Sequence, residues 1–141
     1  MTLVVDTGPL VASLDANDPR GQPVRAVLLN EPGRLLVPAA VAAEADHLAG
    51  RRLGRHARLA LLEDLAEGPY EVVPLKAADL HQALDVDRQY ADLDLGLTDA
   101  TIVVTAHRFE TTRLLSFDER DLRAVTPLQG GAFTLLPTDG T

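Results

Sequence analysis

Four carboxylates occupy unusual positions in this sequence. Asp6 and Asp118 each come directly after a short apolar run of the kind that forms a buried strand. Glu44 and Asp99 border the apolar stripes of two predicted helices, where a carboxylate is seldom found without a partner. Taken singly, each has an ordinary explanation, because acidic residues are favoured at helix N-caps and in first turns. One hypothesis explains all four: they converge into an acidic pocket at one edge of a sheet.

Carboxylates held this close together define a particular chemistry. They repel and raise one another's pKa, so the arrangement is stable mainly when a cation lies among them. The sequence has no Cys and no cluster of His, and oxygen ligands alone favour Mg²⁺, with Mn²⁺ as a substitute, over zinc. A metal held in this way orients and activates water and offsets the charge on a phosphate. The four acids therefore predict a site for phosphodiester hydrolysis.

Short apolar strands alternate with amphipathic helices along the chain. Strands are predicted over 3–5, 34–37, 70–75, 113–117 and 132–136, and helices over 9–14, 24–29, 39–52, 59–65, 77–90 and 98–109, with Thr98 as the cap of the last helix. This alternation predicts an α/β fold with a parallel sheet and helices on both faces. Open α/β sheets bind ligands at the carboxyl ends of their strands, where Asp6 and Asp118 stand.

The composition is typical of a single globular domain. The 141 residues are 46% hydrophobic and 24% charged, which is enough for a core of its own. No apolar run approaches the ~18 residues that a membrane span needs, and the N-terminus has no pattern of an export signal. The absence of Cys excludes disulfides and thiolate chemistry. We therefore expect one domain over residues 1–141, located in the cytoplasm and not in a membrane.

The net charge of −8 has to be weighed against where the basic residues lie. Such a charge usually argues against a nucleic-acid partner, since affinity for phosphates rests largely on Lys and Arg. However, Arg51, Arg55 and Arg58 lie close together and share one face if the segment is a single helix. This stripe is either a solvated surface or a surface that binds the backbone of a nucleic acid. A metal in the acidic pocket together with these arginines would allow RNA to bind.

The segments around the four acids resemble those of PIN-domain ribonucleases, specifically the VapC-type toxins of bacterial toxin–antitoxin pairs. In chain order, the family's acids match Asp6, Glu44, Asp99 and Asp118, in the segments 4–10, 41–45, 96–103 and 114–122. The resemblance extends from residue 3 to about residue 136. The motifs are weak singly and specific as an ordered set.

The resemblance implies a PIN-like three-layer fold whose five-stranded parallel sheet has helices on both faces. It implies a Mg²⁺-dependent endoribonuclease toxin that hydrolyses single-stranded or transfer RNA, forms a homodimer and is inhibited by a VapB-like antitoxin. The four acids would be both catalytic residues and metal ligands. Thr7 and Thr98 match hydroxyl positions that lie beside the acids in this family, and Asp92 and Asp94 are candidate auxiliary acids.

Two alternatives remain open. A PIN-like binding module without catalytic activity would share the fold, although the presence of all four acids argues against it. Asp6-Thr7-Gly8, preceded by two apolar residues, also resembles the catalytic turn of a retroviral-type aspartic protease. That fold is all-β, and the many predicted helices argue against it. A metal-dependent cleavage assay distinguishes a nuclease from a binding module.

Overall fold

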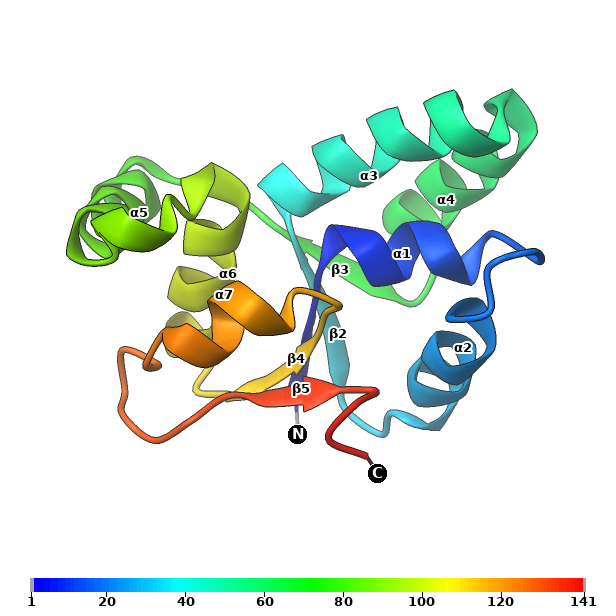
Figure 1. Ribbon diagram of the computed structural model, residues 1–141. Coiled ribbons are helices and arrows are strands. Elements are labelled where there is room, and N and C mark those ends of the chain that lie inside the picture. The colour runs from blue at the N-terminus through cyan, green and yellow to red at the C-terminus, as the bar shows by residue number, and fades with distance from the viewer. Residues whose placement is uncertain (1, 141) are drawn as a thin grey trace.

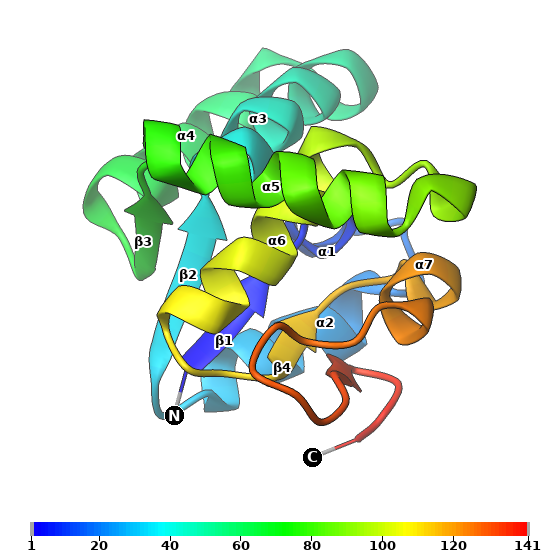
Figure 2. The ribbon, with the colours of Figure 1, turned by 90° about the vertical axis from the view of Figure 1, so that its left-hand side faces the viewer.

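The computed structural model describes residues 2–140, which form one five-stranded sheet covered by helices (Figure 1). The strands are β1 (Thr2–Val5), β2 (Arg34–Pro38), β3 (Tyr70–Val73), β4 (Arg113–Leu115) and β5 (Thr134–Leu136). Every pairing is parallel, and the strand order is β3-β2-β1-β4-β5 (Figure 2). The predicted α/β fold with a five-stranded parallel sheet is therefore confirmed.

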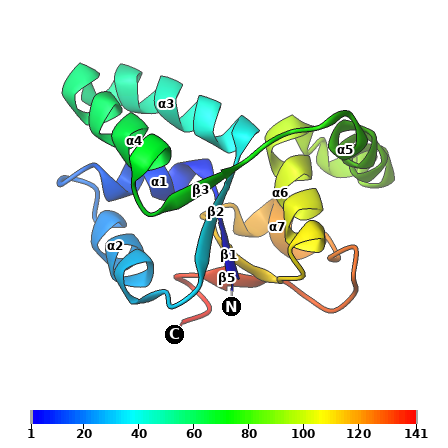
Figure 3. The same cartoon turned by 180° about the vertical axis from the view of Figure 1, so that it is seen from behind.

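Helices connect the strands and cover both faces of the sheet. They are α1 (Thr7–Ser13), α2 (Gly21–Asn30), α3 (Ala39–Leu53), α4 (Arg55–Glu67), α5 (Ala77–Gln89), α6 (Gly96–Arg108) and α7 (Glu119–Ala124), with the short 3₁₀ helix η1 (Ala91–Leu93) before α6. The first four lie on one side of the sheet, and α5 to α7 lie on the other (Figures 1 and 3). The protein therefore has three layers, with the sheet in the middle.

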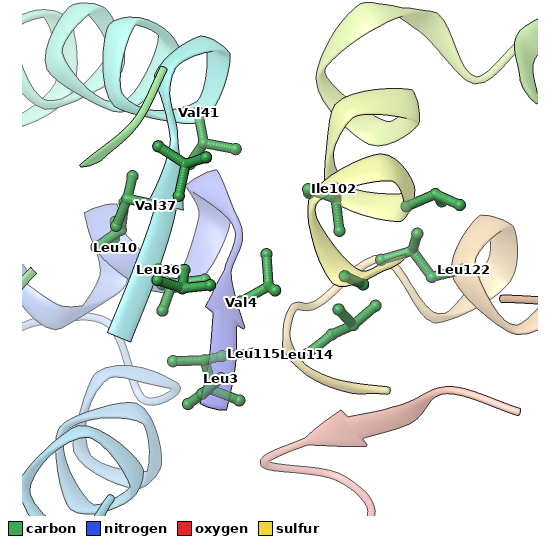
Figure 4. Packing of buried hydrophobic residues seen from close by; sticks show 14 of the residues in the cluster. Leu3, Val4, Leu10, Leu36, Val37, Val41, Ile102, Leu114, Leu115 and Leu122 are labelled. Atoms are coloured by element: carbon green, nitrogen blue, oxygen red, sulfur yellow. The ribbon is translucent and has the colours of Figure 1, made fainter. Parts of the chain in front are cut away.

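The core explains why the strands read as continuous apolar runs. All three apolar residues of β1, at positions 3–5, are wholly buried because helices cover both faces of the strand. Leu10 of α1 and Val41 of α3 pack on one side of β1, and Ile102 of α6 and Leu122 of α7 lie on the other (Figure 4). Each such side chain stabilises the fold by roughly 1.5–3 kcal/mol when it leaves water. The centre of the sheet is thus a firm base for side chains at its edge.

The strand order places a crevice at the carboxyl end of β1. The chain passes from β1 to β2 on one side, whereas β4 pairs with β1 on the other side. Ligands of open α/β sheets bind at such a switch point. In the register, Val5 is level with Leu115, so the residues that follow them, Asp6 and Ser116, lie side by side at this edge.

Some element limits differ from the prediction. The strands predicted over 70–75, 113–117 and 132–136 are shorter in the structure, because their outer residues belong to loops. The last long helix, α6, begins at Gly96, two residues earlier than predicted, so Thr98 lies inside its first turn and is not its N-cap. The Thr98 hydroxyl instead donates a hydrogen bond to Glu44, at 3.1 Å. Thr98 therefore holds a pocket residue in place and does not cap the helix.

The fold also decides one alternative. An aspartic protease of the retroviral type is all-β, whereas this sheet is parallel and helices cover both of its faces. The alternative based on Asp6-Thr7-Gly8 is therefore wrong.

Among residues 2–140, none of the helices combines the length and the hydropathy required to cross a membrane.

Candidate active site

A pocket of about 730 Å³ opens at the carboxyl edge of the sheet. Its lining includes all four acids that the sequence singled out: Asp6 after β1, Glu44 on α3, Asp99 in the first turn of α6 and Asp118 after β4. The four side chains come from segments far apart in the sequence. The parallel topology brings them together because each segment starts or ends at the same edge.

Asp6 and Asp118 are linked through the hydroxyl of Ser116. This hydroxyl donates a hydrogen bond to Asp6 Oδ2 at 2.7 Å and accepts one from the backbone N–H of Asp118 at 3.0 Å. The N–H of Thr7 donates to the other Asp6 oxygen at 2.7 Å, which makes Asp6 the N-cap of α1. Burial raises the pKa of Asp6, although these two hydrogen bonds partly oppose the shift. The capping explanation and the site explanation therefore both apply to Asp6.

Asp99 also has a strongly perturbed ionisation. Burial, the charge on Asp6 and the proximity of Asp118 together raise its pKa to about 8, and burial contributes most. At neutral pH without a cation, Asp99 is therefore largely protonated. Groups with perturbed pKa values in a pocket are typical of functional sites.

Asp121, in the first turn of α7, also belongs to this group of acids. Asp99, Asp118 and Asp121 each offer a carboxylate oxygen, and the three oxygens lie within 4.8 Å of one another. Asp118 is the N-cap of α7 and accepts a hydrogen bond from the N–H of Asp121 at 3.2 Å. A set made only of carboxylate oxygens suits Mg²⁺ or Mn²⁺. The residues thus fit a divalent cation of this kind.

Glu44 differs from the other three acids in its exposure. The sequence predicted that Glu44 borders the apolar stripe of its helix. The buried stripe of α3 consists of Val41, Ala45 and Ala49, and Glu44 lies beside it but is exposed to solvent. Its partner is the Thr98 hydroxyl described above. Glu44 therefore lines the pocket from α3 as an exposed side chain in contact with the first turn of α6.

Gly8 allows the first turn of α1 and Phe117 to approach each other closely. Thr7 is among the residues that line the pocket, and its hydroxyl is buried without a hydrogen-bond partner. A Cβ added to Gly8 would lie 3.0 Å from the ring of Phe117, so glycine lets that ring pack on the first turn of α1. Asp92 and Asp94, the candidate auxiliary acids, are exposed and lie outside the pocket lining.

The arginines at 51, 55 and 58 do not form the continuous stripe that the sequence predicted. Gly54 has a φ of 93°, a conformation that favours glycine, and it separates the end of α3 from the start of α4. Arg51 and Arg55 therefore lie on different helices. None of the three lines the pocket, and Arg58 is paired with Asp46 at 3.1 Å. The prediction of a single helical face is wrong, because one glycine ends the helix.

Sequence reasoning also missed four residues at the pocket: Ser116, Asp121, Arg20 and Arg52. Three of them carried a signal. Ser116 is a hydroxyl at the end of an apolar strand, and Asp121 follows Asp118 by three residues in a helical first turn. Arg52 follows Glu44 by eight positions, so both occupy one face of α3. Arg20 is brought to the pocket by a loop, and its position could not be read from the sequence.

A three-layer α/β fold with an acidic pocket at the switch point of its parallel sheet defines the class of this protein. The model of the PIN domain family matches residues 3–126. The chain belongs to the PIN domain family. It is 36% identical over 135 residues to the protein named Ribonuclease VapC26 of Mycobacterium tuberculosis (strain ATCC 25618 / H37Rv), a match that covers 96% of this chain and 100% of that protein.

Solved structures agree on the fold. VapC20 of Mycobacterium tuberculosis, described as a sarcin-ricin loop cleaving toxin, superposes with a TM-score of 0.78 at 21% identity, over 84% of this chain and 91% of that chain. VapBC2 of Rickettsia felis, solved with a promoter DNA fragment, superposes with a TM-score of 0.69 at 13% identity, over 96% of this chain and 98% of that chain. FitAcB of Neisseria gonorrhoeae superposes with a TM-score of 0.68 at 18% identity, over 94% of this chain and 96% of that chain. The predicted resemblance to VapC-type PIN proteins is confirmed.

Removing the Ser116 hydroxyl should lower the stability of the fold by a measurable amount. Ser116→Ala removes one buried hydrogen bond to Asp6 and one from the N–H of Asp118, so the free energy of unfolding should fall by about 1–3 kcal/mol. Thr7→Val is the matched control, because it removes a buried hydroxyl that has no partner and should cost little or nothing. Denaturant unfolding curves measure both. Equal losses for the two variants would contradict the role assigned to Ser116.

The proton on Asp99 predicts how the stability of the metal-free protein depends on pH. The pKa of Asp99 is about 8 in the folded chain and 3.8 in its reference state, so unfolding between these values releases a proton. The stabilisation from this group is complete below about pH 4 and is lost as the pH rises through about 8. With a chelator present, the melting temperature should fall more steeply from about pH 5 to pH 8 in the wild type than in Asp99→Asn. Parallel curves would rule this out.

Proposed function

We propose that this protein is a divalent-metal-dependent endoribonuclease of the VapC type, which cleaves single-stranded or transfer RNA by phosphodiester hydrolysis. The observation that carries the proposal is the convergence of Asp6, Glu44, Asp99 and Asp118 in one pocket. Membership of the PIN domain family and the 36% identity to a protein named a ribonuclease support the same activity.

The carboxylates divide into two roles. Asp6, Asp99 and Asp118 would hold Mg²⁺, with Asp121 beside them. Glu44, which the Thr98 hydroxyl holds at the same pocket, would orient the ion or its water. A bound Mg²⁺ supplies Lewis-acid stabilisation of phosphate charge and an activated water. Ser116 keeps the Asp6 carboxylate in place, and the Thr98 hydroxyl does the same for Glu44. Both hydroxyls are positioning groups, since fixed ligands determine how well a metal site works.

The relatives also suggest partners. Two of the solved structures are named VapBC2 and FitAcB, and we propose by analogy that a VapB-like antitoxin inhibits this protein. We further propose a homodimer that consists of single PIN domains and acts in the cytoplasm. A non-catalytic PIN-like module remains the alternative, and it predicts no cleavage under any metal condition.

The first test is cleavage of total cellular RNA by the purified protein, with Mg²⁺ and with a chelator. Asp99→Asn should leave the protein folded and reduce cleavage by more than about 100-fold, because even residues that only support metal ligands contribute 10–100-fold. Asp92→Asn is the matched control, since it makes the same chemical change at an exposed acid outside the pocket. Cleavage that survives in Asp99→Asn, or that is lost equally in Asp92→Asn, would contradict the site.

A second test measures the link between metal and stability. Mg²⁺ binds the folded pocket and has little affinity for the unfolded chain, so metal at about 100 times its Kd should stabilise the fold by roughly 2.7 kcal/mol. For a domain of this size, the melting temperature should rise by roughly 8 °C. The rise should vanish in the Asp6→Asn/Asp99→Asn double variant and at acid pH, where the ligands are protonated. A wild-type melting curve that ignores both Mg²⁺ and Mn²⁺ would favour the non-catalytic alternative.

A further inference from the structure

The acidic pocket continues into a groove beside α1. In Figure 1, α1 and α3 run side by side in the same direction, away from the carboxyl edge of the sheet. Glu44, Leu48 and Arg52 follow one another at every fourth position of α3 and all line the groove. Eight positions of helix span about 12 Å. The groove therefore has an acidic end at Glu44 and a second end at Arg52.

Arg52 is the arginine of the groove that is free of ion pairs. It is exposed, and within residues 2–140 it contributes to none of the salt bridges. Six other arginines, among them Arg20 with Asp18 and Arg58 with Asp46, form a salt bridge with a carboxylate. Its neighbour Arg51 is also exposed but lies outside the groove lining. Position 52 thus directs an uncompensated cation at the groove.

Arg20 is the second arginine of the groove, and it is held in a fixed orientation. Its Nε and Nη2 donate hydrogen bonds to the two oxygens of Asp18, at 3.1 and 2.9 Å. Its guanidinium carbon lies 4.3 Å from the centre of the Phe117 ring. Phe117 is also the ring that packs on Gly8 and precedes Asp118. The α1–α2 loop is thereby attached to the segment that carries the fourth acid.

The charges at the two ends differ. The acidic end gathers four carboxylates, whereas Arg52 lies at the other end, and Arg20 joins the lining from the α1–α2 loop together with Asp15 and Asp18. A phosphate can bind at the second end without a metal, because Arg52 has no carboxylate partner and its donors match the geometry of a phosphate. At about 12 Å from Glu44, such a phosphate is not the one placed at the acidic end, but one farther along the same strand.

We propose that the groove between α1 and α3 binds a single RNA strand, and that Arg52 and Arg20 bind phosphodiesters next to the one that is cleaved. The inference rests on the proposed ribonuclease function and names the residues that hold its substrate. These arginines replace the stripe at 51, 55 and 58 as the RNA-binding residues. Arg52 supplies a free charge, and Arg20 supplies a guanidinium that Asp18 and Phe117 keep in place.

The experiment measures binding of a labelled single-stranded RNA to the full chain that carries Asp99→Asn, as a function of salt. Each phosphate contact to a single strand contributes about 0.7 to the slope of log K against log salt. Adding Arg52→Gln should therefore lower the slope by about 0.7 and weaken binding by about 5-fold at 0.1 M salt. Arg51→Gln is the matched control, with the same change of charge at the adjacent position, and should leave the slope unaltered.

A second pair of variants separates the charge of Arg20 from its orientation. Arg20→Gln should lower the slope as Arg52→Gln does. Arg20→Lys keeps the charge but loses the two-point pairing with Asp18 and the contact with Phe117, so it should weaken binding while the slope stays near that of the parent. Loss of slope in Arg20→Lys equal to that in Arg20→Gln would contradict the assigned geometry.

Cleavage of the same RNA by the wild-type protein is measured in parallel, so that the two hypotheses can fail separately. If the wild type cleaves but Arg52→Gln and Arg51→Gln bind alike, the groove assignment is wrong, the ribonuclease function stands, and an acidic protein segment becomes the occupant to test. If RNA binding depends on Arg52 but no RNA is cleaved, the groove assignment stands and the proposed catalysis is wrong. If RNA neither binds nor is cleaved, both are wrong.

Discussion

Repulsion between carboxylates is the constraint on which the arrangement of this protein depends. Asp6 is buried at a strand end, and Asp99 lies close enough to Asp6 and Asp118 for their charges to raise its pKa. Such a group of acids does not favour its own assembly. The three apolar residues of β1, wholly buried between helices on both faces, offset that cost and keep the start of α1 fixed.

The protein holds these acids without pairing them with basic side chains. Within residues 2–140, none of the salt bridges involves Asp6, Glu44, Asp99 or Asp118. The partners of Asp6, Glu44 and Asp118 are instead hydroxyls and backbone N–H groups, such as those of Ser116, Thr98 and Asp121. Hydrogen bonds of this kind orient a carboxylate and leave its charge in place. That property is what a cation site requires, and a surface designed only for stability would pair its acids with arginines.

Local patterns in the sequence predicted the sheet and the acids at its edge, because strand ends and apolar stripes are local features. The exposure of Glu44 was harder, since it depends on the packing of α3 against α1. The prediction that Arg51, Arg55 and Arg58 share one helical face failed because Gly54 takes a left-handed φ and ends α3. A sequence pattern shows only that glycine permits this conformation. Arg20 could not be predicted at all, because Asp18 and Phe117 bring it to the groove from a loop.

The net charge of −8 does not decide whether this chain binds a polyanion, because charges act over short distances in salt. The screening length is about 8 Å at physiological ionic strength, whereas Glu44 and Arg52 are separated by about 12 Å along α3. A phosphate near Arg52 is therefore partly screened from the acids, and one near Glu44 is not. On the proposed function, the arginines determine how firmly the strand is held, and the cation among the acids determines which phosphate reaches the site of cleavage.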